Sequence, residues 1–126
     1  MPKKRTTKKP AFPMPPLKKG EAYIGAIVLA DGSGHHVILL PGDESLPWKA
    51  ALAWAKKKGG DLPNRIEQAM FFADHKDKFQ NAWYWSNTTY AGYAVYAWLQ
   101  SFGFGLQYGL LKSYVSRCRA VRRVAI

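Results

Sequence analysis

The stretch WKAALAWAKKKGGDLPNRIEQAMFF, residues 48–72, decides the fold class, because it predicts two consecutive helices in a chain otherwise rich in strand-forming residues. The first helix is indicated by apolar residues that recur at the spacing of one helical face, namely Trp48, Ala51, Leu52 and Ala55. Ser45 is expected to cap its start, Pro47 suits its first turn, and Gly59 or Gly60 is expected to end it.

The second helix is predicted within LPNRIEQAMFFADHKDKF, residues 62–79. Asn64, followed three residues later by Glu67, is typical of a capping box at a helix start. The spacing predicts a buried face made of Ile66, Ala69, Met70 and Ala73. Glu67 and Asp74 are interpreted as charges on the exposed helix surface and not as catalytic groups.

A β-hairpin is predicted before the helices. AYIGAIVLA and HHVILLP are rich in strand-forming residues, and DGSG between them is typical of a turn. His35 and His36 lie where the chain leaves this turn. Adjacent strand residues point to opposite faces, so the pair is not expected to share a metal ion. We expect both to be ordinary surface histidines.

From Trp83 onwards the pattern changes to short strand-like runs separated by Gly, Ser, Thr and Asn, which are AWYWSN, AVYAWLQSF, LQYGLL and RCRAVRRVAI. The last run is expected to be one strand with a basic edge, formed by Arg117, Arg119, Arg122 and Arg123. The first and last strands are expected to pair with each other. Hairpin, two helices and short antiparallel strands with long loops together predict an α+β fold.

Length and composition limit the classes of protein that remain. A chain of 126 residues suits one domain. Cys118 is the only cysteine, which excludes an internal disulfide, and the spacing of a zinc site is absent. The sequence has no run of 18 apolar residues and no apolar block of a signal peptide, so we expect no membrane span and synthesis in the cytoplasm.

The formal charge of +11 is unevenly distributed. Residues 1–19 carry seven Lys or Arg and no acid, while no Asp or Glu follows Asp77. Residues 1–20 are therefore expected to form a basic, Pro/Lys-rich, disordered tail, with the domain over residues 21–126. The alternative is a tail that contacts nucleic acid or another anionic surface.

Four motifs, in this order, carry a family resemblance: LPWKAALAWAKKKGGDLPNRIEQAMFF, WYWSN, YAWLQSFGFG and KSYVSRCRAVRRV. They resemble the DUF1566 group of C-type-lectin-like proteins and, more narrowly, the variable proteins of diversity-generating retroelements, many of them encoded by phages and prophages. The similarity covers residues 21–124 and omits the tail. It implies a C-type-lectin-like fold with a variable region over about residues 84–123 and, through the phage link, the virion as a destination.

In that family a reverse transcriptase misreads template adenines, so that certain codons vary while others stay fixed. The varied codons cannot encode Trp, Gln, Lys, Glu or Met. Between Asn87 and Ser116 the residues outside the reachable set are Trp98, Gln100, Gln107 and Lys112. We call these four the frame residues; Trp85-Ser86, Ala97, Phe102, Gly105 and Arg117–Arg123 also match the family's fixed positions. The family commonly has Ala where this chain has Cys118.

The resemblance implies a ligand-binding face formed by residues between the fixed positions. These candidates are Tyr90, Gly92, Tyr93, Val95, Tyr96, Leu99, Ser101, Phe104, Leu106, Tyr108, Leu110, Leu111, Ser113, Tyr114 and Ser116. Tyrosine suits such a surface because it offers a large amphipathic contact area at low rotamer cost. The implied partner is a protein or a cell-surface ligand, and the implied setting is a phage receptor-binding or tail-associated module that contacts phage structural proteins.

The fixed positions are expected to hold this face rigid. Trp83, Trp85, Trp98 and Phe102 are expected to pack in the core. Arg119 and Arg122 are expected to donate hydrogen bonds to loop carbonyls. With no acid after Asp77 and no nucleophile–base pair, we expect no calcium or other metal site, no cofactor and no enzymatic activity. The remaining alternative is a nucleic-acid-binding protein that uses the tail and the Arg-rich last strand.

Overall fold

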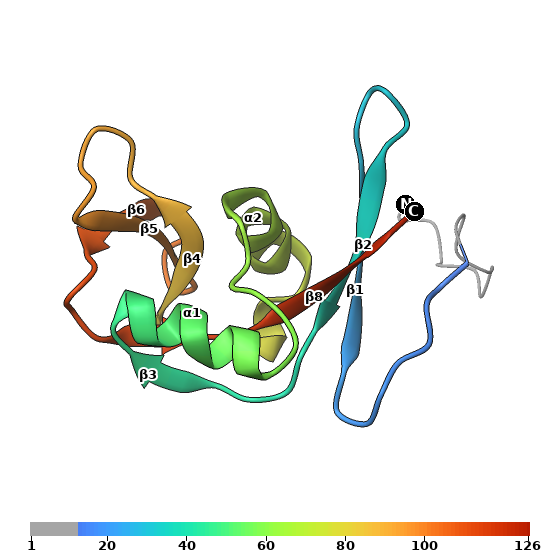
Figure 1. The fold of residues 1–126 in the computed structure, drawn as a ribbon, viewed down its shortest axis with the longest axis horizontal. Helices are drawn as coiled ribbons and strands as arrows, with labels where there is room; N and C mark the ends of the chain where they lie inside the picture. Colours follow the sequence, from blue (N-terminus) through green and yellow to red (C-terminus); the bar gives the residue numbers. More distant parts are fainter. Residues whose placement is uncertain (1–12) are drawn as a thin grey trace, which may run out of the picture.

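A computed structural model describes residues 13–126, and it confirms the α+β class. Short strands precede and follow two helices, as Figure 1 shows. The elements are β1 (Ala22–Val28), β2 (Gly34–Leu39), β3 (Glu44–Leu46), α1 (Trp48–Lys57), α2 (Arg65–Asp74), the 3₁₀ helix η1 (Lys76–Lys78), β4 (Trp83–Thr89), β5 (Tyr96–Ser101), β6 (Gln107–Leu111), β7 (Ser116–Cys118) and β8 (Val121–Ala125).

The strands form two sheets with α2 between them (Figure 1). One sheet has the order β1-β2-β8 and the other β3-β7-β4-β5-β6. The predicted hairpin is confirmed, since β1 pairs antiparallel with β2. The expected pairing of the first and last strands is wrong, because β8 pairs with β2. β2 therefore has a strand on each side, and residues Val37–Leu40 are all buried.

The segment RCRAVRR is two strands and not the single strand expected. β7 belongs to the larger sheet and β8 to the smaller one, with Arg119 and Ala120 between them. Ala120 O accepts a hydrogen bond from Leu40 N at 2.9 Å, and Val121 exchanges two backbone hydrogen bonds of 2.8 Å with Asp61. The chain therefore passes from one sheet to the other in these few residues.

Helix α1 begins after Pro47 and not at a serine cap. Ser45 lies in β3, opposite Arg117 of β7, so the predicted cap is wrong. Leu46, the last residue of β3, directly precedes Pro47, and the residue before a proline favours extended backbone. Trp48, Ala51 and Ala55 are buried as expected, and Gly59 follows the helix with a φ of 86°.

Helix α2 has the predicted capping box, but its buried face is not the one predicted. The buried residues are Glu67, Gln68 and Phe71, whereas Ile66 is 63% exposed. Ala69 and Ala73 are also exposed and Met70 is half-buried. Because α2 lies between two sheets, its inner face meets backbone groups as well as apolar side chains. Gln68 Nε2 donates 3.0 Å hydrogen bonds to the carbonyls of Tyr84 and Trp85.

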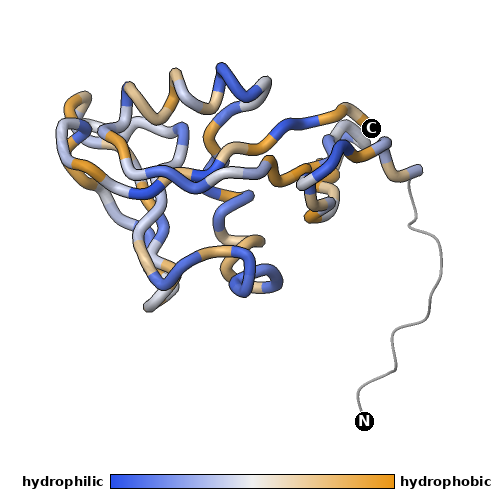
Figure 2. The backbone as a smooth tube through the Cα atoms, turned by 90° about the horizontal axis from the view of Figure 1, so that it is seen from below, coloured by the Kyte–Doolittle hydropathy of each residue, from blue (hydrophilic) through white to orange (hydrophobic). Residues whose placement is uncertain are grey.

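Two apolar clusters fill the interior. One joins α1 to the larger sheet and includes Trp48, Trp85 and Leu99; the other includes Phe71, Tyr84 and Phe102 and reaches the smaller sheet. Figure 2 shows that apolar and polar segments are interspersed along much of the backbone. Within residues 13–126, no helix is long and apolar enough to cross a membrane.

Candidate ligand-binding face

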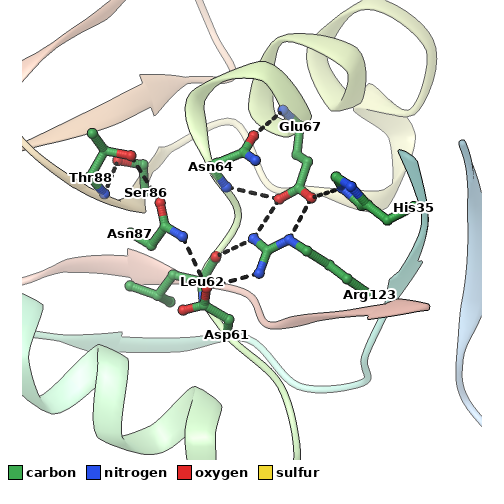
Figure 3. A network of polar contacts seen from close by, with 9 residues as sticks. All are labelled: His35, Asp61, Leu62, Asn64, Glu67, Ser86, Asn87, Thr88 and Arg123. Carbon is green, nitrogen blue, oxygen red and sulfur yellow. Dashed lines mark hydrogen bonds and ion pairs between the residues drawn. The ribbon is translucent and has the colours of Figure 1, made fainter. Parts of the chain in front are cut away.

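Arg123 of β8 organises a polar network between the two sheets (Figure 3). Its Nε and Nη2 each donate to the Glu67 carboxylate at 2.7 Å, and its Nη1 donates to Asp61 Oδ2 at 2.8 Å. His35 Nε2 donates to the same carboxylate at 2.9 Å. Glu67 is fully buried, so its interpretation as a surface charge is wrong. The surface assignment is also wrong for His36, which is 4% exposed, whereas His35 is half-buried.

The environment of Glu67 keeps its carboxylate ionised. Burial by itself would raise the pKa of this group. The hydrogen bonds from Arg123, from Asn64 N and from His35 outweigh burial and lower the pKa below its usual value. The same carboxylate raises the pKa of Arg123 despite burial of the guanidinium. The buried charges are thus paired and hydrogen-bonded, as a stable interior requires.

The expected contacts of Arg119 and Arg122 with carbonyls are confirmed. Arg119 Nη1 donates to Lys78 O at 2.7 Å and its Nη2 to Leu40 O at 3.0 Å. Arg122 Nη2 donates to Pro16 O at 2.9 Å, which attaches the last part of the expected tail to the domain. Residues 1–12 of that tail lie outside the described residues.

The arginines of β7 and β8 do not form a free basic edge. Arg117 pairs with Asp43 at 2.9 Å and Arg122 with Glu21 at 2.9 Å. Arg123 is paired as described above, and Arg119 is half-buried with two nitrogens donating to carbonyls; burial lowers the pKa of this guanidinium. These guanidinium groups bind other parts of the domain, so the prediction of a free basic edge on these strands is wrong.

The four frame residues meet partners that explain why their identities matter. Gln107 Nε2 donates to Gln100 Oε1 at 3.0 Å, and Gln107 Oε1 accepts from Arg65 Nε at 3.0 Å. The Arg65 guanidinium lies 3.5 Å from the centre of the Trp98 ring. Lys112 Nζ lies 4.2 Å from the centre of the Trp48 ring and donates to Thr89 Oγ1. Three frame residues therefore gather around Arg65.

Trp98 was expected in the core, but it is half-buried. Its indole lies between the Arg65 guanidinium and the Tyr90 ring, whose centre is 4.4 Å away at an interplanar angle of 29°. Tyr90 in turn lies 6.1 Å from Tyr93 and 6.3 Å from Tyr96, between ring centres. The stack links the frame residues to a cluster of tyrosines.

The tyrosines surround a pocket of about 440 Å³. Its lining consists of Tyr90, Tyr93, Tyr96, Tyr108 and Gly109. Tyr93 is 63% exposed and Tyr108 is 38% exposed, so the phenols reach solvent. Burial of part of the Tyr108 ring raises the pKa of its phenol. An aromatic hollow with a few hydroxyl groups can bind apolar or CH-rich groups of a ligand and orient them by hydrogen bonds.

Most of the other predicted face residues are exposed or half-buried. Gly92, Val95, Phe104, Leu106, Ser113 and Tyr114 are exposed, and Leu110, Leu111 and Ser116 are half-buried. Ser116 Oγ donates to Trp83 O at 2.8 Å, which is a structural contact. Trp83 itself is half-buried, whereas Trp85 and Phe102 are in the core as expected.

The assignment of two residues to the face is wrong. Leu99 is 1% exposed and Ser101 is 2% exposed. Both lie on the side of β5 that faces the interior, because alternate residues of a strand point to the same face. Ser101 Oγ accepts a hydrogen bond from Phe104 N at 3.1 Å, so its hydroxyl is used within the loop.

Sequence reasoning missed Arg65 and Gly109 as parts of the face. Arg65 lies in the first turn of α2, and a basic residue at this position of a helix does not by itself indicate a binding site. Gly109 carries a steric signal that only coordinates reveal: a Cβ atom at this position would lie 2.4 Å from Cδ2 of Tyr90. The glycine therefore lets the Tyr90 ring lie directly against β6.

Cys118 is fully buried, and burial raises the pKa of its thiol to about 12. No group of three or more His, Cys, Asp and Glu residues within 13–126 is placed to hold a metal ion.

No family model matches the sequence, and no curated protein matches it significantly.

Proposed function

We propose that this chain is a ligand-binding display protein with a C-type-lectin-like fold, of the kind that diversity-generating retroelements vary. Its C-terminal face binds a protein or a cell-surface target, in the setting of a phage receptor-binding or tail-associated module. The observation that carries the proposal is the tyrosine pocket. Its phenols lie on the surface of a scaffold held by hydrogen bonds and ion pairs. Binding residues on a rigid scaffold are the usual arrangement in recognition proteins.

The contrast between two groups of side chains supports this function. The frame residues, which the resemblance treats as fixed, bond to one another or to Arg65, Thr89 and Trp48. All four pocket tyrosines belong to the residue types that the varied codons can encode. Replacement of an exposed pocket residue such as Tyr93 would therefore change the surface while the contacts of the frame residues stay intact.

The nucleic-acid alternative loses one of its two supports. The four arginines of residues 117–123 are engaged in ion pairs and carbonyl contacts within the described residues. A guanidinium group held in this way is poorly placed to contact phosphate. The tyrosine face therefore remains the better candidate for recognition.

The diversification part of the proposal is tested in the neighbouring DNA. We expect a near-copy of the codons for residues 84–123 that differs from them only where the copy has adenine, beside a reverse-transcriptase gene. The codons of the frame residues should be identical in the two copies. If a near-copy differs at other bases, or if none is present, the retroelement must be removed from the proposal.

The binding part is tested with fluorescent full-length chain on a panel of bacterial cells. Exchanging Tyr93 and Tyr108 together for Ser should lower bound fluorescence about tenfold or more, as loss of interface hot spots does. Leu29→Ser is the control, because Leu29 is 57% exposed, follows β1 and is outside the predicted face. Equal binding by the double variant and the native chain would refute the assignment of the pocket.

A further inference from the structure

Strand β6 is the last strand of the larger sheet, and one of its edges has no strand beside it within the described residues. Ser101 N donates to Leu106 O and Lys112 N donates to Val95 O, both at 2.8 Å. In an antiparallel pair, the residues whose N–H and C=O groups face the partner strand alternate with residues whose groups face away. By this alternation Gly109 presents its N–H and C=O outward.

This edge lacks the features that normally protect an exposed strand. Natural edge strands are blocked by charged residues, prolines, bulges or very short length. The sequence of β6 is QYGLL, with no charge and no proline. The other edges differ: β1 has an irregularity between Tyr23 and Gly25, β3 has only three residues, and β8 carries two arginines. β6 is therefore the most open of these edges for main-chain pairing.

The tyrosine pocket extends over this edge. Gly109 and Tyr90 lie on one face of the sheet, because Gly109 pairs with Trp98 and the Tyr90 ring stacks on that indole. Tyr108 points to the opposite face, where its ring centre is 4.4 Å from that of Trp83. A pocket lined by Tyr90, Tyr108 and Gly109 must therefore pass across the strand edge between the two faces.

The charges around this edge favour an acidic occupant. Arg65 is bonded to Gln107, the first residue of β6, and Lys112 directly follows its last residue. No Asp or Glu follows Asp77 in the sequence, so β6 and its loops contribute no negative charge. A cation therefore lies at each end of an otherwise neutral strand. Complementary charge guides such an encounter and fixes its register.

We infer that the open edge of β6 binds an extended, acidic peptide segment of the partner protein, which adds a strand to the sheet. The main chain of the segment pairs with Gly109 and its neighbours, and one of its apolar side chains enters the tyrosine pocket. Acidic side chains of the segment lie toward Arg65 and Lys112. This inference rests on the proposed function and specifies protein as the target and strand addition as the mode of binding.

The test begins with a library of random ten-residue peptides selected on immobilised full-length chain. We expect enrichment of peptides that combine Asp or Glu with an apolar residue. Peptides with two adjacent glycines at their centre should be absent. The strongest peptide is then synthesised in two series, N-methylated at one or the other set of alternate residues. Methylation stiffens both series equally, so each is the control for the other.

Strand addition predicts that one series binds about tenfold or more weakly than the unmethylated peptide, since it loses interface hydrogen bonds, while the other series binds nearly as well. Equal affinity of the two series overturns the inference. If binding is then still lost in the Tyr93→Ser, Tyr108→Ser variant, the proposed function survives without strand addition. If that variant also binds the peptide normally, both fail.

Two further outcomes also contradict the inference. A selection that enriches no peptide shows that the edge does not accept an extended segment. The molar mass of the chain in solution tests for a second copy at the same edge. A dimer that dissociates when the selected peptide is added would assign the edge to a second copy of this chain and not to an acidic partner.

Discussion

Arg123 and Glu67 are joined by two hydrogen bonds of 2.7 Å, which connect the last strand to the first turn of α2. Glu67 also closes the capping box with Asn64, so one buried carboxylate fixes both the start of a helix and the position of a strand. The stability of the domain is therefore expected to depend strongly on this pair.

Glu67→Gln should lower the free energy of unfolding by about 3 kcal/mol at neutral pH, since it leaves the Arg123 charge without its buried partner. The pKa of Glu67 is lowered in the folded state. Its contribution is therefore complete above the unfolded pKa of about 4.3 and is lost as the pH falls through the lower folded value. Denaturant unfolding of both proteins between neutral and acid pH should show the difference shrinking in acid. A constant difference would mean that the carboxylate charge is unimportant.

Gly109→Ala should destabilise the domain by about 1–3 kcal/mol, because the new methyl group displaces the Tyr90 ring from its stack on Trp98. The same exchange in a Tyr90→Ala background should cost little, since the obstructing ring is gone. A double-mutant cycle followed by thermal unfolding measures this coupling. Additive effects of the two exchanges would contradict the close contact.

Tyr84→Phe and Tyr93→Phe separate scaffold from surface by removing the same hydroxyl group. Tyr84 is buried; its hydroxyl donates to Asp43 at 2.6 Å and accepts from Gln80 N at 3.0 Å. Burial and the Asp43 contact raise its pKa to about 12. Its exchange should cost about 1–3 kcal/mol of stability. The exposed Tyr93 should change stability by no more than about 0.5 kcal/mol. Comparable losses in chemical denaturation would show that Tyr93 is structural.

Cys118 should resist alkylation by iodoacetamide in the native protein at neutral pH. The thiol is fully buried and its pKa is raised to about 12, whereas the reactive species is the exposed thiolate. Modification measured by mass spectrometry should become rapid only in denaturant, and its rate in water should follow opening of the fold. Rapid labelling of the native chain would show that β7 opens locally.

Local sequence signals predicted the elements well. The hairpin turn, the capping box of Asn64 and Glu67, and the apolar face of α1 all depend on residues close in sequence. The predicted face of α2 was wrong because burial there includes Glu67 and Gln68, whose polarity is satisfied by distant strands. Hydrophobic periodicity contains no information about such partners.

The candidate face was predicted only in part for the same reason. The pocket tyrosines, Leu99 and Ser101 were all assigned to the face because they lie between the fixed positions that the resemblance implies, without knowledge of the register of β5. Once β5 is placed, alternation along the strand turns both inward. Arg65 became part of the face only when α2 was placed beside Trp98.

The position of β7 and β8 so late in the chain has a consequence for biosynthesis. β7 lies between β3 and β4 in one sheet, and β8 completes the other beside β2. Neither sheet can close while residues 116–125 are still inside the ribosome. The β1–β2 hairpin and the β4-β5-β6 strands can pair earlier, but until then the free edges of β2 and β4 stay uncovered, and such unpaired strand edges favour aggregation of the nascent chain.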